Sequence, residues 1–347
     1  MLCVSVLVGG CGGTAAHVEV STSGSHTPAS TSGIATTPNP SLKVGLVRDV
    51  GTYPGGALGA LAVLGLQRAR GELGVETRSV AARSTVEAQA GLSSLADGGY
   101  DLVLGLGANT IGALGAVAAA YPKVTFAAID RPVTRVPGRP RNVVGLTFRD
   151  EQAGYLAGYL AGLIEKRAAG GKNTIGWIGA RNTPPIARYI AGYIAGAHAA
   201  DPSVTVLHDY SQTFRDQAKC KEPALKQRAL GSDIEFQVAG SCGLGALDAA
   251  KERNAWGIGS VVDESYLGPH ILTSAVKHVD VAVLATIRAM QDRSLRTGTD
   301  IVFDASSGGV GLGEISPRVP QEVVAKIRVV ELRLASGAIP GIPTTIR

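Results

Sequence analysis

The sequence predicts an α/β fold built from two doubly wound parallel sheets. From residue 43 to residue 254, short runs rich in Val, Ile and Leu alternate with longer stretches of helical periodicity. This alternation is typical of parallel strands joined by helices that cover both faces of a sheet. It continues for long enough to form two sheets, and 347 residues suffice for two lobes of ordinary size.

The predicted elements fall into two series. In the first, strands are expected at 43–48, 75–80, 101–106, 124–129 and 143–148, and helices at 57–73 and 85–96. In the second, helices are expected at 151–166, 186–199, 214–230 and 244–254, and strands at 174–178, 204–208 and 233–238. A C-terminal helix is expected at 321–335. Each series supplies strands for one sheet.

Composition and motifs favour a binding protein over an enzyme. Hydrophobic residues make up 45% of the chain and charged residues 18%, as in a packed globular protein. The net charge of +5 comes from scattered residues, so no nucleic-acid partner is expected. We find no dinucleotide fingerprint, no phosphate-binding loop and no paired His ligands, and therefore expect no cofactor and no metal. Cys242 has no neighbouring base motif, so no catalytic residue is expected.

Polar or glycine-rich segments follow nearly every predicted strand. Ligands of open parallel sheets bind at the carboxyl ends of the strands. Those positions hold Asp49, Asn109, Asp130, Gly240-Ser241 and Asp263. The pattern fits a cleft between two lobes, and it equally fits the turns that any α/β protein needs.

The N-terminus resembles a bacterial lipoprotein signal. Ten uncharged residues end in Val8-Gly9-Gly10 before Cys11, and a stretch rich in Ser, Thr, Gly and Pro follows. We therefore expect a signal-peptide remnant at 1–10 and, at 11–42, a lipidated Cys11 with a disordered tether. The protein would lie on the extracytoplasmic face of the cell membrane, anchored by lipid. A chance cysteine is the alternative, because the positively charged n-region is missing; a true start upstream of Met1 would also explain that.

The remaining cysteines form an even pair. Cys3 would leave with the signal and Cys11 would carry lipid, which leaves Cys220 and Cys242 in an oxidising compartment. A disulfide between them is expected, with two buried thiols as the alternative.

Several segments together resemble the basic membrane protein (BMP) family of substrate-binding lipoproteins, which includes purine-nucleoside receptors of ABC importers. The matching segments are 48–51, 126–130, 142–148, 151–158, 175–179, 214–216, 239–245 and 272–277. The most specific is Gly154-Tyr155-Leu156-Ala157-Gly158. Gly154, Gly158 and Gly162 recur every fourth residue, which predicts a bare helix face that another backbone approaches closely.

The resemblance implies a type I periplasmic-binding-protein fold, whose two lobes close over a ligand by hinge motion. Lobe one would hold 43–148 and about 270–300, and lobe two 149–269 and about 301–347. The chain would capture a small solute for an ABC permease driven by a separate ATPase, without being an enzyme itself. The alternative is a ligand-sensing regulatory module of the same fold that is not coupled to transport. An extracellular enzyme on a related fold is disfavoured by the missing catalytic constellation.

The chain departs from the family where nucleosides are held. The family's first loop reads T-D-x-G-G-x-x-D-K-S-F-N, and its Phe and Asn positions fall on Leu58 and Gly59. The later G-V-D-S-D-Q falls on 259–264, where Val261 replaces the first aspartate and Asp263 keeps the second. Losing a hydrogen bond to a charged group lowers affinity about tenfold or more. Either other residues rebuild the site, or the ligand is not a nucleoside.

The candidate ligand contacts come from the strand ends, the family pattern and the residues that would rebuild the site. They are Asp49, Tyr53, Asn109, Asp130, Phe214, Gly240, Ser241, Asp263 and Lys277. Five of them have a structural alternative. Asp49 and Asp130 would cap a helix or a turn, Lys277 would be an ordinary exposed lysine, and Gly240 and Ser241 would form a tight turn.

Overall fold

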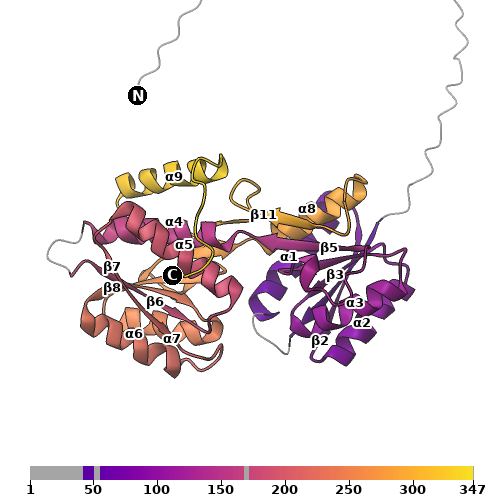
Figure 1. Ribbon diagram of the computed structural model, residues 1–347, viewed down its shortest axis with the longest axis horizontal. Helices are drawn as coiled ribbons and strands as arrows, with labels where there is room; N and C mark the ends of the chain where they lie inside the picture. The colour runs from indigo at the N-terminus through magenta and orange to yellow at the C-terminus, as the bar shows by residue number, and fades with distance from the viewer. Residues whose placement is uncertain (1–41, 51–54, 168–171, 347) are drawn as a thin grey trace, which may run out of the picture. The chain divides into compact units, whose positions relative to one another are not determined.

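The computed structural model describes residues 42–50, 55–167 and 172–346 (Figure 1). The expected signal remnant, the tether with Cys11, and Tyr53 lie outside the described residues. Two six-stranded sheets organise the described part, which confirms the predicted α/β class. None of the helices in these ranges combines the length and the apolarity that crossing a bilayer requires.

The first sheet is wholly parallel, in the order β11-β5-β4-β3-β1-β2. Its strands are β1 (Lys43–Asp49), β2 (Glu76–Ala82), β3 (Leu102–Leu106), β4 (Thr125–Ile129), β5 (Val143–Phe148) and β11 (Asp300–Phe303). The helices α1 (Gly55–Leu73), α2 (Thr85–Asp97), α3 (Ala108–Ala120) and α8 (Val279–Gln291) complete this first lobe (Figure 1). Every residue of β3 is buried, as expected for a strand covered on both faces.

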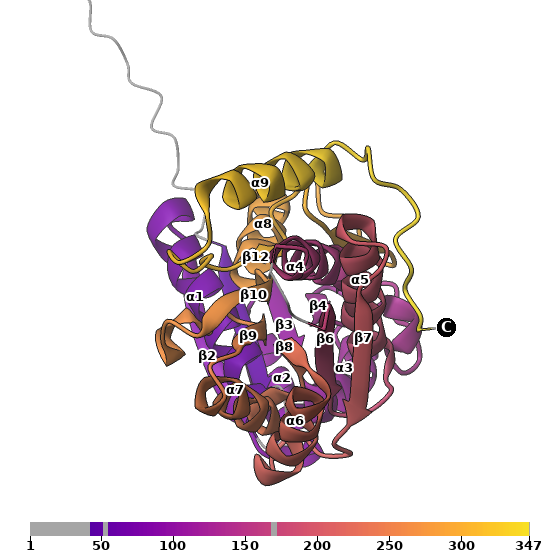
Figure 2. The ribbon, with the colours of Figure 1, turned by 90° about the vertical axis from the view of Figure 1, so that its left-hand side faces the viewer.

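The second sheet has the order β12-β10-β9-β8-β6-β7, and only β12 runs antiparallel to its neighbour. Its strands are β6 (Thr174–Gly179), β7 (Thr205–Tyr210), β8 (Ser232–Val238), β9 (Trp256–Val261), β10 (Ile271–Lys277) and β12 (Val310–Leu312). The second lobe adds α4 (Asp150–Glu165), α5 (Pro184–Ala200), α6 (Ala218–Leu230), α7 (Gly243–Glu252) and α9 (Gln321–Ala335). Figure 2 shows α9 beside α4.

The chain crosses between the two sheets three times, after β5, after β10 and after β11. The crossings are tied together: Arg149 N donates to Phe303 O (2.9 Å), and His278 N donates to Gly309 O (2.9 Å). The return to lobe one is expected at about 270. Strand β10 still belongs to the second sheet, so the chain returns to the first lobe only after this strand. The elements that return to the first lobe are α8 and β11.

Helix α6 begins at Ala218, four residues after the expected start at 214. Side chains hold the intervening backbone in turns: Arg215 N and Asp216 N donate to Thr213 Oγ1, and Ala218 N donates to Asp216 Oδ1. Thr and Asp side chains compete with helical hydrogen bonding in this way, which explains the later start.

Glycines bring α4 and α5 into backbone contact, as the sequence predicts. A Cβ on Gly154 or Gly158 would overlap the carbonyl oxygens of Tyr189 and Tyr193 on α5. The relation is reciprocal, because a Cβ on Gly196 would overlap the carbonyl of α4 residue Tyr155. Such an approach permits Cα–H···O contacts between the two helices.

Replacing Gly158 with Ala is expected to lower the free energy of unfolding by up to about 3 kcal/mol, because the methyl group meets backbone that cannot rotate away. The measurement is the urea unfolding midpoint. Gly71→Ala on α1 is the control: nothing lies within 4 Å of its Cβ position, so it should raise stability by about 0.5–1 kcal/mol. An unchanged midpoint for Gly158→Ala would contradict close packing of α4 on α5.

Candidate functional site

A pocket of about 320 Å³ lies at the carboxyl ends of strands in the second sheet, and residues from both lobes line it. Its lining consists of Gly56, Ala57, Arg215, Gly240, Ser241, Leu244, Ser260, Val261, Val262, Glu264 and Tyr266. The first two come from α1 of the first lobe, and the rest come from segments at the ends of β8 and β9 and before α6. This is where ligands of parallel α/β sheets bind.

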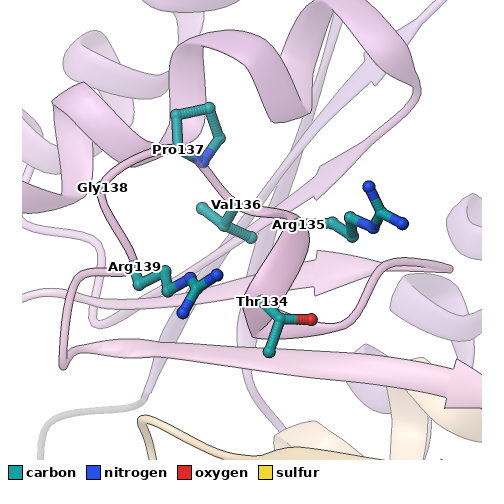
Figure 3. A pocket seen from close by; sticks show the side chains of 6 residues that line it. All are labelled: Thr134, Arg135, Val136, Pro137, Gly138 and Arg139. Atoms are coloured by element: carbon teal, nitrogen blue, oxygen red, sulfur yellow. The ribbon is translucent and has the colours of Figure 1, made fainter.

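A larger hollow of about 500 Å³ lies elsewhere, at the loop after β4 (Figure 3). The residues lining it, Thr134 to Arg139, are consecutive, and their side chains point in different directions. Ligand sites use polar groups that converge from several elements. The smaller pocket therefore remains the candidate site.

Glu264 is the buried acid of this pocket. Its Oε2 accepts hydrogen bonds from Gln237 Nε2 (2.7 Å) and Ser260 N (3.3 Å). Burial raises the pKa of Glu264 to about 7, although the hydrogen bonds from Gln237 and Ser260 act in the opposite direction. The carboxyl group is therefore close to its titration point at neutral pH.

Backbone strain marks the same pocket. Val261 has φ +73°, and Val262 N donates to Ser260 O across it (2.9 Å). A hydrogen bond from residue i+2 to residue i with a positive central φ defines a rare, strained γ-turn. A β-branched residue there is an outlier, and such outliers concentrate at ligand sites. This strain is an independent reason to place function at the end of β9.

A disulfide fixes the glycine-containing rim of the pocket. Cys220 on α6 is bonded to Cys242, with Cα atoms 5.6 Å apart. Cys242 N also donates to Phe214 O (3.1 Å), so the turn that carries Gly240 and Ser241 is tied to the segment before α6. Gly240 has φ +63°, which a residue with a side chain rarely adopts. The structure thus brings Gly240 and Ser241 to the pocket, while Phe214 is not among its lining residues.

Asp49 and Asn109 meet each other at the start of α3. Asp49 is fully buried, and its Oδ2 accepts a hydrogen bond from Asn109 N (3.0 Å). The Asn109 side chain accepts from Thr85 Oγ1 (3.2 Å). These contacts match the helix-capping alternative for Asp49. Neither residue lines the pocket, and their assignment as ligand contacts stays a prediction.

Asp263 lies beside the pocket residue Glu264, but backbone donors occupy its carboxylate. Oδ1 accepts from Ser265 N (3.0 Å), and Oδ2 accepts from Glu314 N (2.9 Å). The bond from Glu314 N ties the loop after β9 to the segment after β12. A direct role for Asp263 in ligand binding also stays a prediction.

Lys277 is buried between two carboxylates. Its Nζ lies 2.8 Å from Asp130 Oδ1 and 3.0 Å from Asp150 Oδ1, with only 2% of its side chain exposed. The Phe148 ring centre is 5.0 Å from Nζ. Because Asp130 follows β4 and Lys277 ends β10, this ion pair joins the two lobes. Lys277 is therefore not an ordinary exposed lysine, and it does not line the pocket.

Burial and charge shift the pKa values of this cluster in opposite directions. Burial raises the pKa of Asp150 to about 7, against the opposing charge of Lys277. Burial lowers the pKa of Lys277, but the charges of Asp130 and Asp150 outweigh it and hold that pKa above its usual value. Within the described ranges, no group of three His, Cys, Asp or Glu side chains is arranged to hold a metal ion.

Sequence reasoning missed Glu264, Gln237 and Asp150. Glu264 directly follows Asp263 and occupies the last position of the family pattern on 259–264, which was the available signal. Gln237 lies inside a strand, and nothing in its spacing distinguishes it from other strand residues. Asp150 reads as an ordinary acidic residue at a helix start.

Comparison with known proteins supplies the family. A family model for PnrA-like substrate-binding proteins of ABC transporters, named Bmp, matches residues 43–340. The ABC transporter nucleoside-binding protein BmpA of Lactococcus lactis is 31% identical over 233 residues, covering 62% of this chain and 64% of its own length. The chain thus spans a little under two thirds of that relative. Basic membrane protein A of Borreliella afzelii is 30% identical over 289 residues, covering 82% of this chain and 86% of its own length.

A solved structure supports the fold. The solute-binding protein of an ABC transporter system from Conexibacter woesei superposes with a TM-score of 0.73 at 23% identity, covering 88% of this chain and all of that one. At this level of identity the likeness concerns the fold alone. It agrees with the expected type I periplasmic-binding-protein architecture of two parallel α/β lobes.

Proposed function

The chain belongs to the Bmp family of PnrA-like ABC transporter substrate-binding proteins, and from this premise we propose that it captures a nucleoside in the pocket at the ends of β8 and β9. The bound solute would pass to an ABC permease driven by a separate ATPase. The protein would work at the extracytoplasmic face of the cell membrane, anchored by lipid on Cys11.

The observation that carries the proposal is the composition of the pocket. Ligand pockets of about 300–1,000 Å³ combine an apolar lining with a few placed polar groups. This pocket, at about 320 Å³, suits a small solute. Ala57, Val261 and Leu244 offer apolar surface, while Ser241 and Glu264 offer polar groups. A nucleoside, with its flat apolar faces and polar edges, matches that combination.

Among the expected ligand contacts, we propose Gly240 and Ser241 as direct ones. Asp130 and Lys277 would act indirectly, since their ion pair joins the lobes that close on the solute. Leu58, at the family's stacking position, is 2% exposed and packs in the core of the first lobe. A rebuilt contact surface would therefore come from Gly56 and Ala57, which line the pocket just before it.

The test is a thermal-shift and calorimetric screen of the full chain against nucleosides, free bases, sugars and amino acids. A nucleoside at a hundred times its dissociation constant should stabilise the protein by about 2.7 kcal/mol. Ser241→Tyr should abolish that shift by filling the pocket, whereas Ser94→Tyr on the exposed side of α2 should keep it. Stabilisation by sugars or amino acids, with none by nucleosides, would refute the nucleoside class.

A further inference from the structure

The two oxygens of the Glu264 carboxylate have different surroundings. Oε2 accepts two hydrogen bonds, from Gln237 Nε2 and Ser260 N. Oε1 has no hydrogen-bond partner among the described residues, and it is not sealed from solvent. Since Glu264 lines the pocket, Oε1 is a polar atom left open to a ligand there.

The protein fixes the orientation of this carboxylate. Ala239 N donates to Gln237 Oε1 (3.0 Å), so the Gln237 amide must present its NH₂ group to Glu264. Glu264 N donates to Ser274 Oγ (2.9 Å), which holds the backbone. Gly259 makes room, because a Cβ there would come 2.5 Å from Oε2. None of these contacts engages Oε1, so in the ionised carboxylate this oxygen is free to accept a hydrogen bond.

We infer that Glu264 is the specificity-determining anchor of the pocket, whose Oε1 accepts a hydrogen bond from an N–H or O–H donor of the bound solute. The pocket would therefore select a solute with an amino, ring N–H or hydroxyl donor over an analogue of the same shape without it. This inference rests on the proposed function and names the recognition chemistry within it. Hydrogen bonds to charged groups are stronger than neutral ones, so a missing donor weakens binding about 10- to 100-fold.

Glu264→Gln is the matched variant. The Gln237 amide, which Ala239 N orients, and the backbone N–H of Ser260 both donate to the Oε2 position, so the amide oxygen of the new side chain should occupy it. The NH₂ group then points into the pocket, where it opposes a ligand donor. The glutamine side chain has nearly the same size as glutamate, so the variant should fold and keep a melting temperature close to that of the wild type. Glu222→Gln, on the exposed face of α6, is the control for the loss of one charge.

The experiment measures dissociation constants for the full chain with paired probes: adenosine with purine riboside, guanosine with inosine, and adenosine with 2′-deoxyadenosine. Each pair differs by one donor group. The wild type should prefer the donor-bearing member of one pair by about 10- to 100-fold. In Glu264→Gln that preference should disappear, and affinity for the preferred nucleoside should fall by a similar factor.

A pH series gives a second readout that does not depend on the variant. Binding of a donor should tighten as pH rises through about 7, because the ionised carboxylate is the better acceptor and burial raises the pKa of Glu264 to about 7. Among the described residues, Asp263 is the charged neighbour on the same loop, and Arg215 and Tyr266 are the other charged or titratable side chains that line the pocket. Glu264→Gln should lose this pH dependence.

The outcomes separate the two proposals. Glu264→Gln binding within threefold of the wild type, or wild-type binding that tightens at low pH, would overturn the role of Glu264 and leave the nucleoside proposal standing. If neither the wild type nor Glu264→Gln binds any nucleoside, the proposed function is refuted, and the inference with it. A preference for the member without the donor would also overturn the inference.

Discussion

Replacing Lys277 with Met should lower the free energy of unfolding by about 3–5 kcal/mol at pH 8. The substitution keeps the length of the side chain but leaves the buried Asp150 carboxylate without the cation 3.0 Å away. Asp130, which shares the same ammonium group at 2.8 Å, would add like-charge repulsion. Lys326→Met, on the exposed face of α9, should change stability by less than about 0.5 kcal/mol and serves as the control.

The effect should depend on pH. The pKa of Asp150 is raised to about 7 in the folded protein, so the stability associated with its proton is present at low pH and is lost as pH rises toward 7. Removing Lys277 takes away the charge that lowers the pKa of Asp150, so in the variant the loss of stability continues to higher pH. The destabilisation should therefore be largest above pH 7 and smaller at pH 5, as measured by urea unfolding across that range.

A double variant isolates the interaction between Lys277 and Asp150. Asp150→Asn in the Lys277→Met background removes the uncompensated charge, so it should recover part of the lost stability. A loss below about 1 kcal/mol for Lys277→Met at pH 8 would mean that water, rather than Lys277, compensates Asp150. Because the ion pair with Asp130 joins the two lobes, the same variant also tests what holds them together.

Local patterns in the sequence predict most elements up to residue 254, because each needs only its own residues, whereas the strands β9, β10, β11 and β12 are not predicted. The predicted strand at 43–48 matches β1, and the glycine spacing in 151–166 predicts the contact of α4 with α5. Helix α3 is missed because its segment, Ala108 to Ala120, is almost wholly small and apolar and has no polar face to reveal helical periodicity. Short apolar runs therefore identify even a fully buried strand such as β3, whereas a helix of small apolar residues gives no periodic signal.

The site is less predictable, because it depends on pairing between distant segments. From the sequence, Lys277 is either a ligand contact or an exposed lysine, and neither interpretation anticipates its ion pair with Asp130, 147 residues away in the chain. Nothing in the sequence marks Glu264 as buried, because its hydrogen bond from Gln237 joins two strand ends that lie 27 residues apart in the chain. Asp49 is predicted as a ligand contact, but a carboxylate after a strand can equally cap a helix. Its hydrogen bond from Asn109 N places it at the start of α3.

Replacing Glu235 with Gln should make the protein more stable at pH 8, by about 2–4 kcal/mol. Glu235 lies on β8 with no exposed surface, and neither of its carboxylate oxygens has a hydrogen-bond partner among the described residues. Burial raises its pKa to about 8, against the opposing influence of Ser232 and Arg228. The folded protein therefore keeps this proton at pH values where the unfolded chain has lost it.

The direction of the change in stability with pH follows from this difference in protonation between the folded and unfolded states. Between about pH 4.5 and pH 8 the folded state holds more protons than the unfolded state, so stability falls by up to about 1.4 kcal/mol per pH unit. Glutamine has the same shape and never ionises.

The measurement is the difference in free energy of unfolding between Glu235→Gln and the wild type, from pH 5 to pH 8.5. Taking the difference cancels the contributions of Asp150, Glu165 and Glu264, whose pKa values are raised in both proteins. The difference should grow with pH and level off above about 8, while Glu222→Gln, whose partner Lys226 is exposed, should show no such growth. A difference that stays flat would mean that Glu235 ionises freely, and therefore that solvent reaches the core of the second lobe.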